Sequence, residues 1–163
     1  MSTKSATDRG VQIPPLSGRL SFRIHQLSAQ LARIVNPMFR EFGIDSVSSQ
    51  ILLLVQERQA LGISELLDIL HLPQSTISHQ LQRLEKRGYL TRERIDKDQR
   101  NVTIRLTDTG HHVANECEAA SAEVYEAMMD KLPNGTIEEI CADLDAIRDR
   151  LANLHAHKLE TDA

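Results

Sequence analysis

Apolar residues in the first half of the chain recur at the spacing of α-helices. Between residues 16 and 42 an apolar position returns every three or four residues, which predicts one long amphipathic helix. Pro37 falls inside this pattern and should kink or end the helix, and Gly43 is a C-terminal signal beyond it. Three shorter helices are predicted at residues 48–60, 63–70 and 74–87.

The hydrophobic period changes after Gly88. Residues 101–106 alternate apolar and polar side chains, which is typical of a half-buried strand. Residues 89–95 are its expected antiparallel partner, and residues 96–101 between the two contain no apolar side chain at all. We therefore predict a β-hairpin with a long, charged loop.

Two long helices complete the chain. The first follows Thr107, a candidate N-cap, and the second follows Thr136. In the second, apolar residues are separated by alternating steps of three and four, which is the pattern of a helix in a bundle or coiled coil; they are Ile137, Ile140, Leu144, Ile147, Leu151 and Leu154. We expect the long helices of two chains to form one shared bundle, and the alternative is packing on their own subunit.

The order of helix, tight turn, helix and hairpin is that of a winged helix-turn-helix. The predicted fold class is therefore mainly α with a small β-hairpin: a winged helix-turn-helix plus long dimerisation helices. We expect a DNA-binding lobe at residues 47–106 and a helical dimerisation region at residues 19–46 and 107–157. The ends are expected to be flexible, as an arm at residues 1–18 and a tail at residues 158–163.

Charge changes the picture because it is unevenly distributed. The net charge of the 163 residues is −4, yet residues 63–106 carry eight Lys and Arg against six Asp and Glu. Residues 107–163 carry four against 13, so the middle of the chain can face phosphates and the last third cannot. There is no run of about 18 apolar residues and no signal-peptide pattern, so we expect a soluble cytoplasmic protein.

The helix predicted at residues 74–87 has the face that DNA contact requires. With Ile77, Leu81 and Leu84 buried, the opposite face carries hydrogen-bond donors and no acidic side chain except Glu85. Solvated helix faces usually mix both charge signs, so DNA contact is favoured over simple exposure. The donors are Ser75, Thr76, Ser78, His79, Gln82, Arg83 and Lys86.

The run LPQSTISHQLQRLEKRGYLTRE, continued by DKDQRNVTIRLTDTG, resembles the MarR family of winged-helix transcriptional regulators. The similar features are Leu-Glu-x-x-Gly after the recognition helix, Asp-x-Arg in the loop and Leu-Thr-x-x-Gly opening the next helix. Motifs cover about residues 50–110, and element order covers about residues 16–157. The resemblance implies a homodimer on a pseudo-palindromic operator, acting as a repressor that a small phenolic or aromatic carboxylate, or its thioester, releases.

The resemblance also assigns individual residues. Ser75, Thr76, Ser78, His79 and Arg83 match positions that contact bases in the major groove. Arg100 matches an arginine that enters the minor groove from the hairpin loop, and Asp98 matches the acid that orients this loop. His79 and Gln99 stand where the family commonly has arginine, which implies weaker attraction to phosphate and a gentler salt dependence.

The site of the effector is less well marked. Arg19 and Arg23 could pair with a carboxylate and His25 could bond with a phenol, although all three could equally be solvent-facing. Cys117 and Cys141 raise the alternative of a redox-sensing repressor, and a DNA-binding protein that senses nothing is a third possibility. Adjacent His111 and His112 do not have the spacing of metal ligands, and no motif indicates a cofactor or an enzyme.

Overall fold

The structure is a computed structural model that describes residues 12–94, 102–130, 132–133 and 136–161, with the backbone alone for Arg94 and residues 155–161. The chain divides into two compact units, Met1–Ser121 and Ala122–Ala163. The predicted hairpin loop, with Asp98 and Arg100, lies outside the described residues. The same holds for residues 1–11 of the predicted arm and residues 162–163 of the predicted tail.

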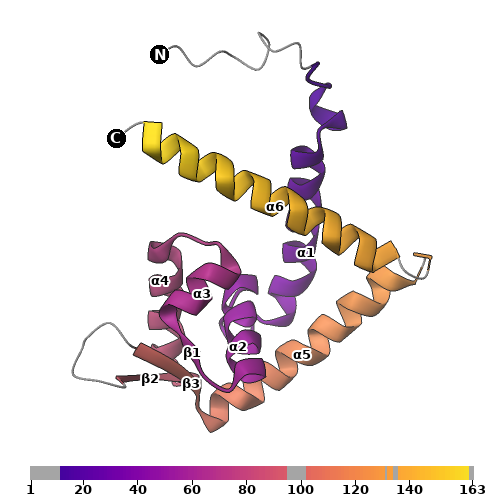
Figure 1. Cartoon of the computed structure of the whole chain (residues 1–163). Coiled ribbons are helices and arrows are strands. Elements are labelled where there is room, and N and C mark those ends of the chain that lie inside the picture. The colour runs from indigo at the N-terminus through magenta and orange to yellow at the C-terminus, as the bar shows by residue number, and fades with distance from the viewer. Residues whose placement is uncertain (1–11, 95–101, 131, 134–135, 162–163) are drawn as a thin grey trace. The chain divides into compact units, whose positions relative to one another are not determined.

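The first unit contains five α-helices, one 3-10 helix and a small antiparallel sheet within its described residues (Figure 1). The elements run in the order α1 (Leu20–Met38), α2 (Ser46–Arg58), β1 (Leu61–Gly62), α3 (Ile63–Leu70), α4 (Gln74–Lys86), β2 (Leu90–Arg94), β3 (Val102–Leu106) and α5 (Asp108–Met129), which continues into the second unit. This order confirms the predicted winged-helix architecture, and α3 has the predicted bounds.

Helix α1 is shorter than predicted. The pattern predicted one helix over residues 16–42, but a separate 3-10 helix occupies Leu16–Gly18 and Arg19 is extended at φ −82° and ψ 134°. Helix α1 ends at Met38, one residue after Pro37, as the missing amide of proline led us to expect. Gly43 lies beyond the helix, in the turn before α2, with a φ of +62°.

Strand β1 is the element that the sequence did not predict. The sheet order is β1–β3–β2, and Leu61 of β1 pairs with Ile104 of β3. Two residues are too few to show an alternating pattern, so β1 is defined only by its pairing partner. On the other side of β3, the register with β2 runs from Leu90 opposite Leu106 to Arg94 opposite Val102.

The Leu-Thr-x-x-Gly motif forms the junction between the hairpin and α5. Thr107 Oγ1 donates to the Gly88 carbonyl at 2.6 Å and accepts from the Gly110 amide at 3.0 Å, so its predicted capping role is confirmed. The Thr107 amide donates to the Tyr89 carbonyl at 3.1 Å. A Cβ atom on Gly110 would overlap that same carbonyl oxygen, so a residue with a side chain cannot occupy this position without movement of the backbone.

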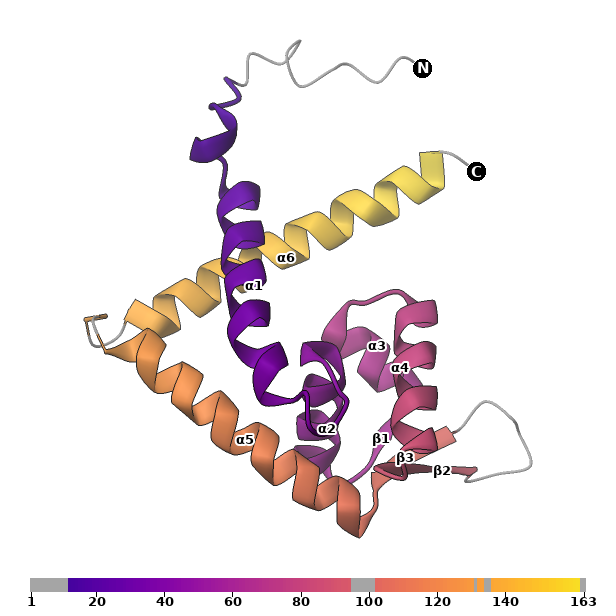
Figure 2. The ribbon, with the colours of Figure 1, turned by 180° about the vertical axis from the view of Figure 1, so that it is seen from behind.

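The core of the first unit is aliphatic, as the low aromatic content of 3% implies. It joins the turn before α2, the winged-helix elements and the first half of α5, so the hairpin and helices share one core. Figure 2 shows the ribbons of these elements, with the start of α5 beside the hairpin strands. Its largest fully buried side chains are Phe39, Ile51, Leu52, Val55, Leu61, Leu66, Ile77, Leu81, Leu84, Leu90, Ile104 and Val113. Leu53 and Leu54 of α2 are only partly buried, so the apolar centre of this helix is not wholly enclosed by the core.

The second unit consists of the end of α5 and of α6 (Thr136–Thr161). The apolar side chains of the predicted bundle stripe on α6 are largely exposed; Leu151, for example, is 60% exposed. None of the described helices is long and apolar enough to cross a membrane.

Candidate nucleic-acid interface

Helix α4 is divided into a buried and an exposed side. Ile77, Leu81 and Leu84 have no exposed surface, which confirms the buried face predicted from their spacing. The opposite side is open to solvent, with Thr76 and Arg83 at its partly buried edges. Its exposed donors are Ser75, Ser78, His79, Gln82 and Lys86.

The N-terminal end of α4 has the features of an anion site. Within the described residues no side chain caps its first amides, and its first turn carries no acidic residue. The Thr76 and Ile77 amides donate to the Pro73 carbonyl, and the amides before them, together with the helix dipole, favour a phosphate at such an end. Helix α2 differs, because Asp45 caps it by accepting from the Ser48 amide at 2.9 Å.

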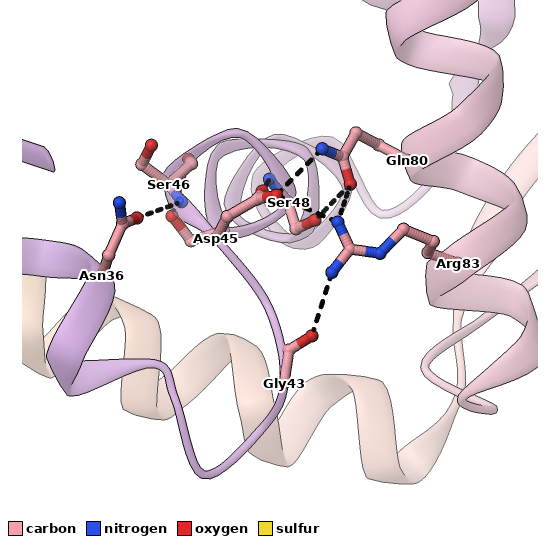
Figure 3. Close-up of polar contacts among 8 residues, drawn as sticks. Asn36, Gly43, Asp45, Ser46, Ser48, Gln80 and Arg83 are labelled. Atoms are coloured by element: carbon pink, nitrogen blue, oxygen red, sulfur yellow. Dashed lines mark hydrogen bonds and ion pairs between the residues drawn. The ribbon is translucent and has the colours of Figure 1, made fainter.

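Arg83 lies differently from the exposed donors of α4. Its guanidinium bonds with the Asp45 carboxylate at 3.1 Å and donates to the Gly43 carbonyl at 3.3 Å. Gln80, on the same side of the helix, also donates to Asp45, at 3.0 Å, and accepts from the Ser48 hydroxyl at 2.9 Å. Figure 3 shows that Gln80 and Arg83 extend from α4 toward the N-terminal end of α2. Contact between Arg83 and bases stays a prediction.

The pKa of Asp45 reflects this environment. Burial raises the pKa of the carboxyl, but hydrogen bonds from the Ser48 amide and hydroxyl, from Gln80 and from Arg83 outweigh burial and lower it below its ordinary value. Asp45 is therefore a carboxylate at neutral pH, and it accepts bonds from two residues of α4. Neither Asp45 nor Gln80 was among the predicted functional residues, although an aspartate before Ser46 is a recognisable N-cap signal.

Hairpin strands β2 and β3 each carry an arginine in an ion pair, and the pair of β2 is with α4. Arg92 of β2 pairs with Glu85, the one acidic residue on the exposed surface of α4, at 3.1 Å. This ion pair compensates the negative charge of Glu85 beside the proposed DNA surface. Arg105 of β3 pairs with Glu93 across the hairpin at 3.2 Å.

The three candidate effector residues lie at the start of α1, and all are exposed. Arg19 precedes the helix and its Nε donates to the Pro14 carbonyl at 3.0 Å. Arg23 follows four residues later, close to the same side of the helix, whereas His25 lies about 200° from Arg23 at about 100° per residue. One ligand could reach Arg19 and Arg23 together more easily than Arg23 and His25.

The two cysteines have contrasting surroundings. Cys117 is buried in α5, and burial, with the nearby Glu116 charge, raises the pKa of its thiol to about 11. Cys141 is exposed on α6. Among the described residues no group of three or more His, Cys, Asp or Glu could hold a metal ion.

Comparison with known proteins agrees with this geometry. The family described as transcriptional regulator SarA/Rot matches residues 33–117. The HTH-type transcriptional regulator SarZ of Staphylococcus epidermidis is 27% identical over 110 residues, which are 68% of this chain and 74% of that protein. The organic hydroperoxide resistance transcriptional regulator of Bacillus subtilis is 30% identical over 95 residues, 58% of this chain and 65% of that protein.

Solved structures have the same fold. The Staphylococcus aureus MepR–DNA complex matches with a TM-score of 0.72 and 18% identity, over 83% of this chain and 98% of that one. CouR from Rhodococcus jostii, bound to p-coumaroyl-CoA, matches with a TM-score of 0.72 and 21% identity, over 82% and 94%. Together with the exposed donor face of α4, these matches identify the chain as a DNA-binding transcriptional regulator of the SarA/Rot family, with the fold of MarR-type winged-helix proteins.

Proposed function

We propose that the protein is a repressor that binds a pseudo-palindromic operator as a homodimer and is released by a small aromatic carboxylate or its thioester. The observation that carries the DNA-binding part is the division of α4 into an apolar buried face and an exposed face of donors. Donors of this kind bond with the N7 and O6 acceptors of purines in the major groove. The amides at the start of α4 would meet phosphate on the same side.

Within this interface, each residue has a proposed role. Ser75, Thr76, Ser78, His79 and Gln82 contact base edges, and Lys86 contacts phosphate. On the hairpin loop, Arg100 enters the minor groove and Asp98 orients that loop. The dimerisation region comprises residues 19–46 and 107–157, and it sets the two α4 helices about 34 Å apart, which is one turn of DNA.

The exposed apolar residues of the long helices support the homodimer. On α1, Leu20, Ile24, Leu27 and Ile34 are exposed, and Leu27 is 54% exposed. Leu144 and Leu151 are exposed on α6. Monomeric proteins rarely leave such rows of large apolar side chains in water, so a second copy of the chain is the proposed occupant. The heptad spacing on α6 suits a partner helix.

The DNA-binding proposal is tested by selecting binding sequences from a random duplex library with the full chain. We expect an enriched site with two inverted halves, bound by a dimer. His79→Ala should remove the base preference at one position of each half-site, which corresponds to a loss of about 1–3 kcal/mol of discrimination between bases. Lys86→Ala should instead lower the affinity for all duplexes alike. It should also reduce the salt slope, the dependence of log affinity on log salt concentration, by about one unit per phosphate contact. Failure to enrich any sequence would overturn the proposal.

The effector is tested on the selected duplex with benzoate, hydroxycinnamates and their coenzyme A thioesters. Arg19 and Arg23 are the proposed partners of the carboxylate or the thioester phosphates, and His25, on the other side of α1, is a separate candidate for bonding with a phenol. Release by one of these compounds, reduced in Arg23→Ala, would support a ligand sensor. No release by any of them, and none by peroxide, would favour a DNA-binding protein that senses nothing.

A redox-sensing repressor is the second candidate function, favoured by the similarity to the organic hydroperoxide resistance regulator. Reactive cysteines are exposed and have lowered pKa values. Cys117 is buried, with the pKa of its thiol raised to about 11, so Cys141 is the better candidate. Peroxide should then release DNA from the wild type and from Cys117→Ser, but not from Cys141→Ser.

A further inference from the structure

The turn between α1 and α2, residues 39–45, is held by side chains from α4 and from the residue before β2. Arg83 Nη2 donates to the Gly43 carbonyl at 3.3 Å, and Tyr89 Oη donates to the Phe42 carbonyl at 3.0 Å. Backbone carbonyls of the turn therefore serve as acceptors for groups that belong to the proposed DNA-binding elements. The end of α1 and helix α4 are linked through this turn.

Gln80 is a polar residue on the buried side of α4, with 8% of its surface exposed. Its amide oxygen accepts from Ser48 at 2.9 Å and from Arg83 at 3.2 Å, and its amide nitrogen donates to Asp45 at 3.0 Å. An apolar side chain of similar size would fill this place without the cost of burying an amide. The directional bonds contribute a preferred orientation, which apolar packing does not supply as sharply.

Orientation matters for a helix that contacts bases. The side chains of a helix extend to roughly 5–6 Å from its axis, so a rotation of about 20° moves their ends by about 2 Å. A hydrogen bond is lost over such a distance. Asp45 belongs to the N-cap of α2 and not to α4, so bonds from Gln80 and Arg83 to Asp45 oppose this rotation directly.

We propose that Arg83 and Gln80 are positioning residues for DNA recognition. Held by Asp45, they set the rotation of α4 that presents its exposed donors to the base edges, and Arg83 does so without itself contacting DNA. The proposal rests on the proposed function, and it differs from the sequence analysis, which assigned Arg83 to the bases. Discrimination between DNA sequences would then depend on residues that contact no base.

The test is a double-mutant cycle on the selected operator and on an unrelated duplex of equal length, each measured over a range of salt concentrations. Asp45→Asn keeps an acceptor for the Ser48 amide but places an NH₂ group against the donors Gln80 and Arg83. We expect Asp45→Asn, Arg83→Ala and the double variant to lose operator affinity to a similar extent, about tenfold or more. Binding to the unrelated duplex and the salt slope should not change.

Direct contact of Arg83 with DNA gives a different result. Arg83→Ala would then lower the affinity for both duplexes or reduce the salt slope. Its loss of binding free energy would also add to the loss caused by Asp45→Asn. Either outcome overturns the proposal. Arg58→Ala is the charge-matched control, because Arg58 pairs only with exposed Glu57 on α2, at 3.7 Å, among the described residues. Circular dichroism and thermal unfolding confirm that each variant is folded at the assay temperature.

Gln80→Met separates positioning from stability. Methionine fills a similar volume without polar atoms, and Ser48→Ala added beside it removes the buried hydroxyl that would lose its acceptor, so this double variant should unfold close to the wild-type temperature. Its ratio of operator to unrelated-duplex affinity should nevertheless fall several-fold. An unchanged ratio would overturn the proposal. If the wild type itself selects no DNA sequence, the proposed function fails. If the wild type is selective and its variants are equally selective, only the positioning proposal fails.

Discussion

The substitution Gly110→Ala has two opposite effects on stability, a gain in helix propensity and a loss of steric fit. Alanine favours a helix over glycine by about 0.8–1 kcal/mol, so propensity alone predicts a more stable protein. In the structure, however, the new Cβ would overlap the Tyr89 carbonyl oxygen, which is a backbone atom that cannot rotate away. The start of α5 would have to move from the hairpin. That movement weakens the bonds of Thr107 with the Gly88 carbonyl, at 2.6 Å, and the Tyr89 carbonyl, at 3.1 Å.

The magnitude follows from these terms. Overpacking costs about 1–3 kcal/mol and each of the two hydrogen bonds contributes about 0.5–1.5 kcal/mol, so the loss exceeds the propensity gain and leaves a destabilisation of about 1–5 kcal/mol. For a protein of this size, that lowers Tm by roughly 2–20 °C.

Thermal unfolding followed by circular dichroism measures this effect. Gly88→Ala is the matched control. Its φ of +73° predicts backbone strain, but a Cβ there would have no heavy atom within 4 Å apart from its chain neighbours, so only about 1–2 kcal/mol should be lost. An unchanged or raised Tm for Gly110→Ala would refute the close approach of α5 to the hairpin.

Three further predictions concern other parts of the molecule. Because the pKa of the Asp45 carboxyl is lowered in the folded state, its stabilising contribution is present above pH 3.8 and is lost as pH falls through the lowered pKa. The Tm difference between wild type and Asp45→Asn should therefore be constant above about pH 5 and shrink below about pH 4. Gln59→Gly should raise stability by about 0.5–1 kcal/mol in chemical denaturation, since Gln59 has a φ of +62°; a loss would contradict the strain. Leu151→Asp should give monomers in sedimentation, and a dimer of unchanged stability would place the interface elsewhere.

Periodicity was sufficient for the winged-helix elements. Ile77, Leu81 and Leu84 recur at helical spacing and are fully buried. Apolar and polar residues alternate from Val102 to Leu106, and this segment is strand β3. Local signals also located the end of α1 at Pro37 and the start of α5 at Thr107. These features depend on neighbours within one or two helical turns, so the sequence contains them directly.

Long-range partners were less accessible to sequence reasoning. Strand β1 exists because Leu61 pairs with Ile104, 43 positions away in the chain. Likewise, Arg83 could be placed near the exposed face of α4, but its bond with Asp45 depends on how the α1–α2 turn meets that helix. The polarity of Gln80 among apolar neighbours was the available signal, since a buried amide requires partners.

The central claim is that the exposed donors of α4 determine which DNA sequence is bound. The most direct measurement is to repeat the selection from a random duplex library with wild type, Ser78→Ala, His79→Ala and the control Arg58→Ala, an exposed position on α2 outside the dimerisation region. The account predicts that the first two substitutions change the preferred bases within each half-site and that the control keeps the wild-type sequence. Identical selected sequences from all four proteins would contradict it.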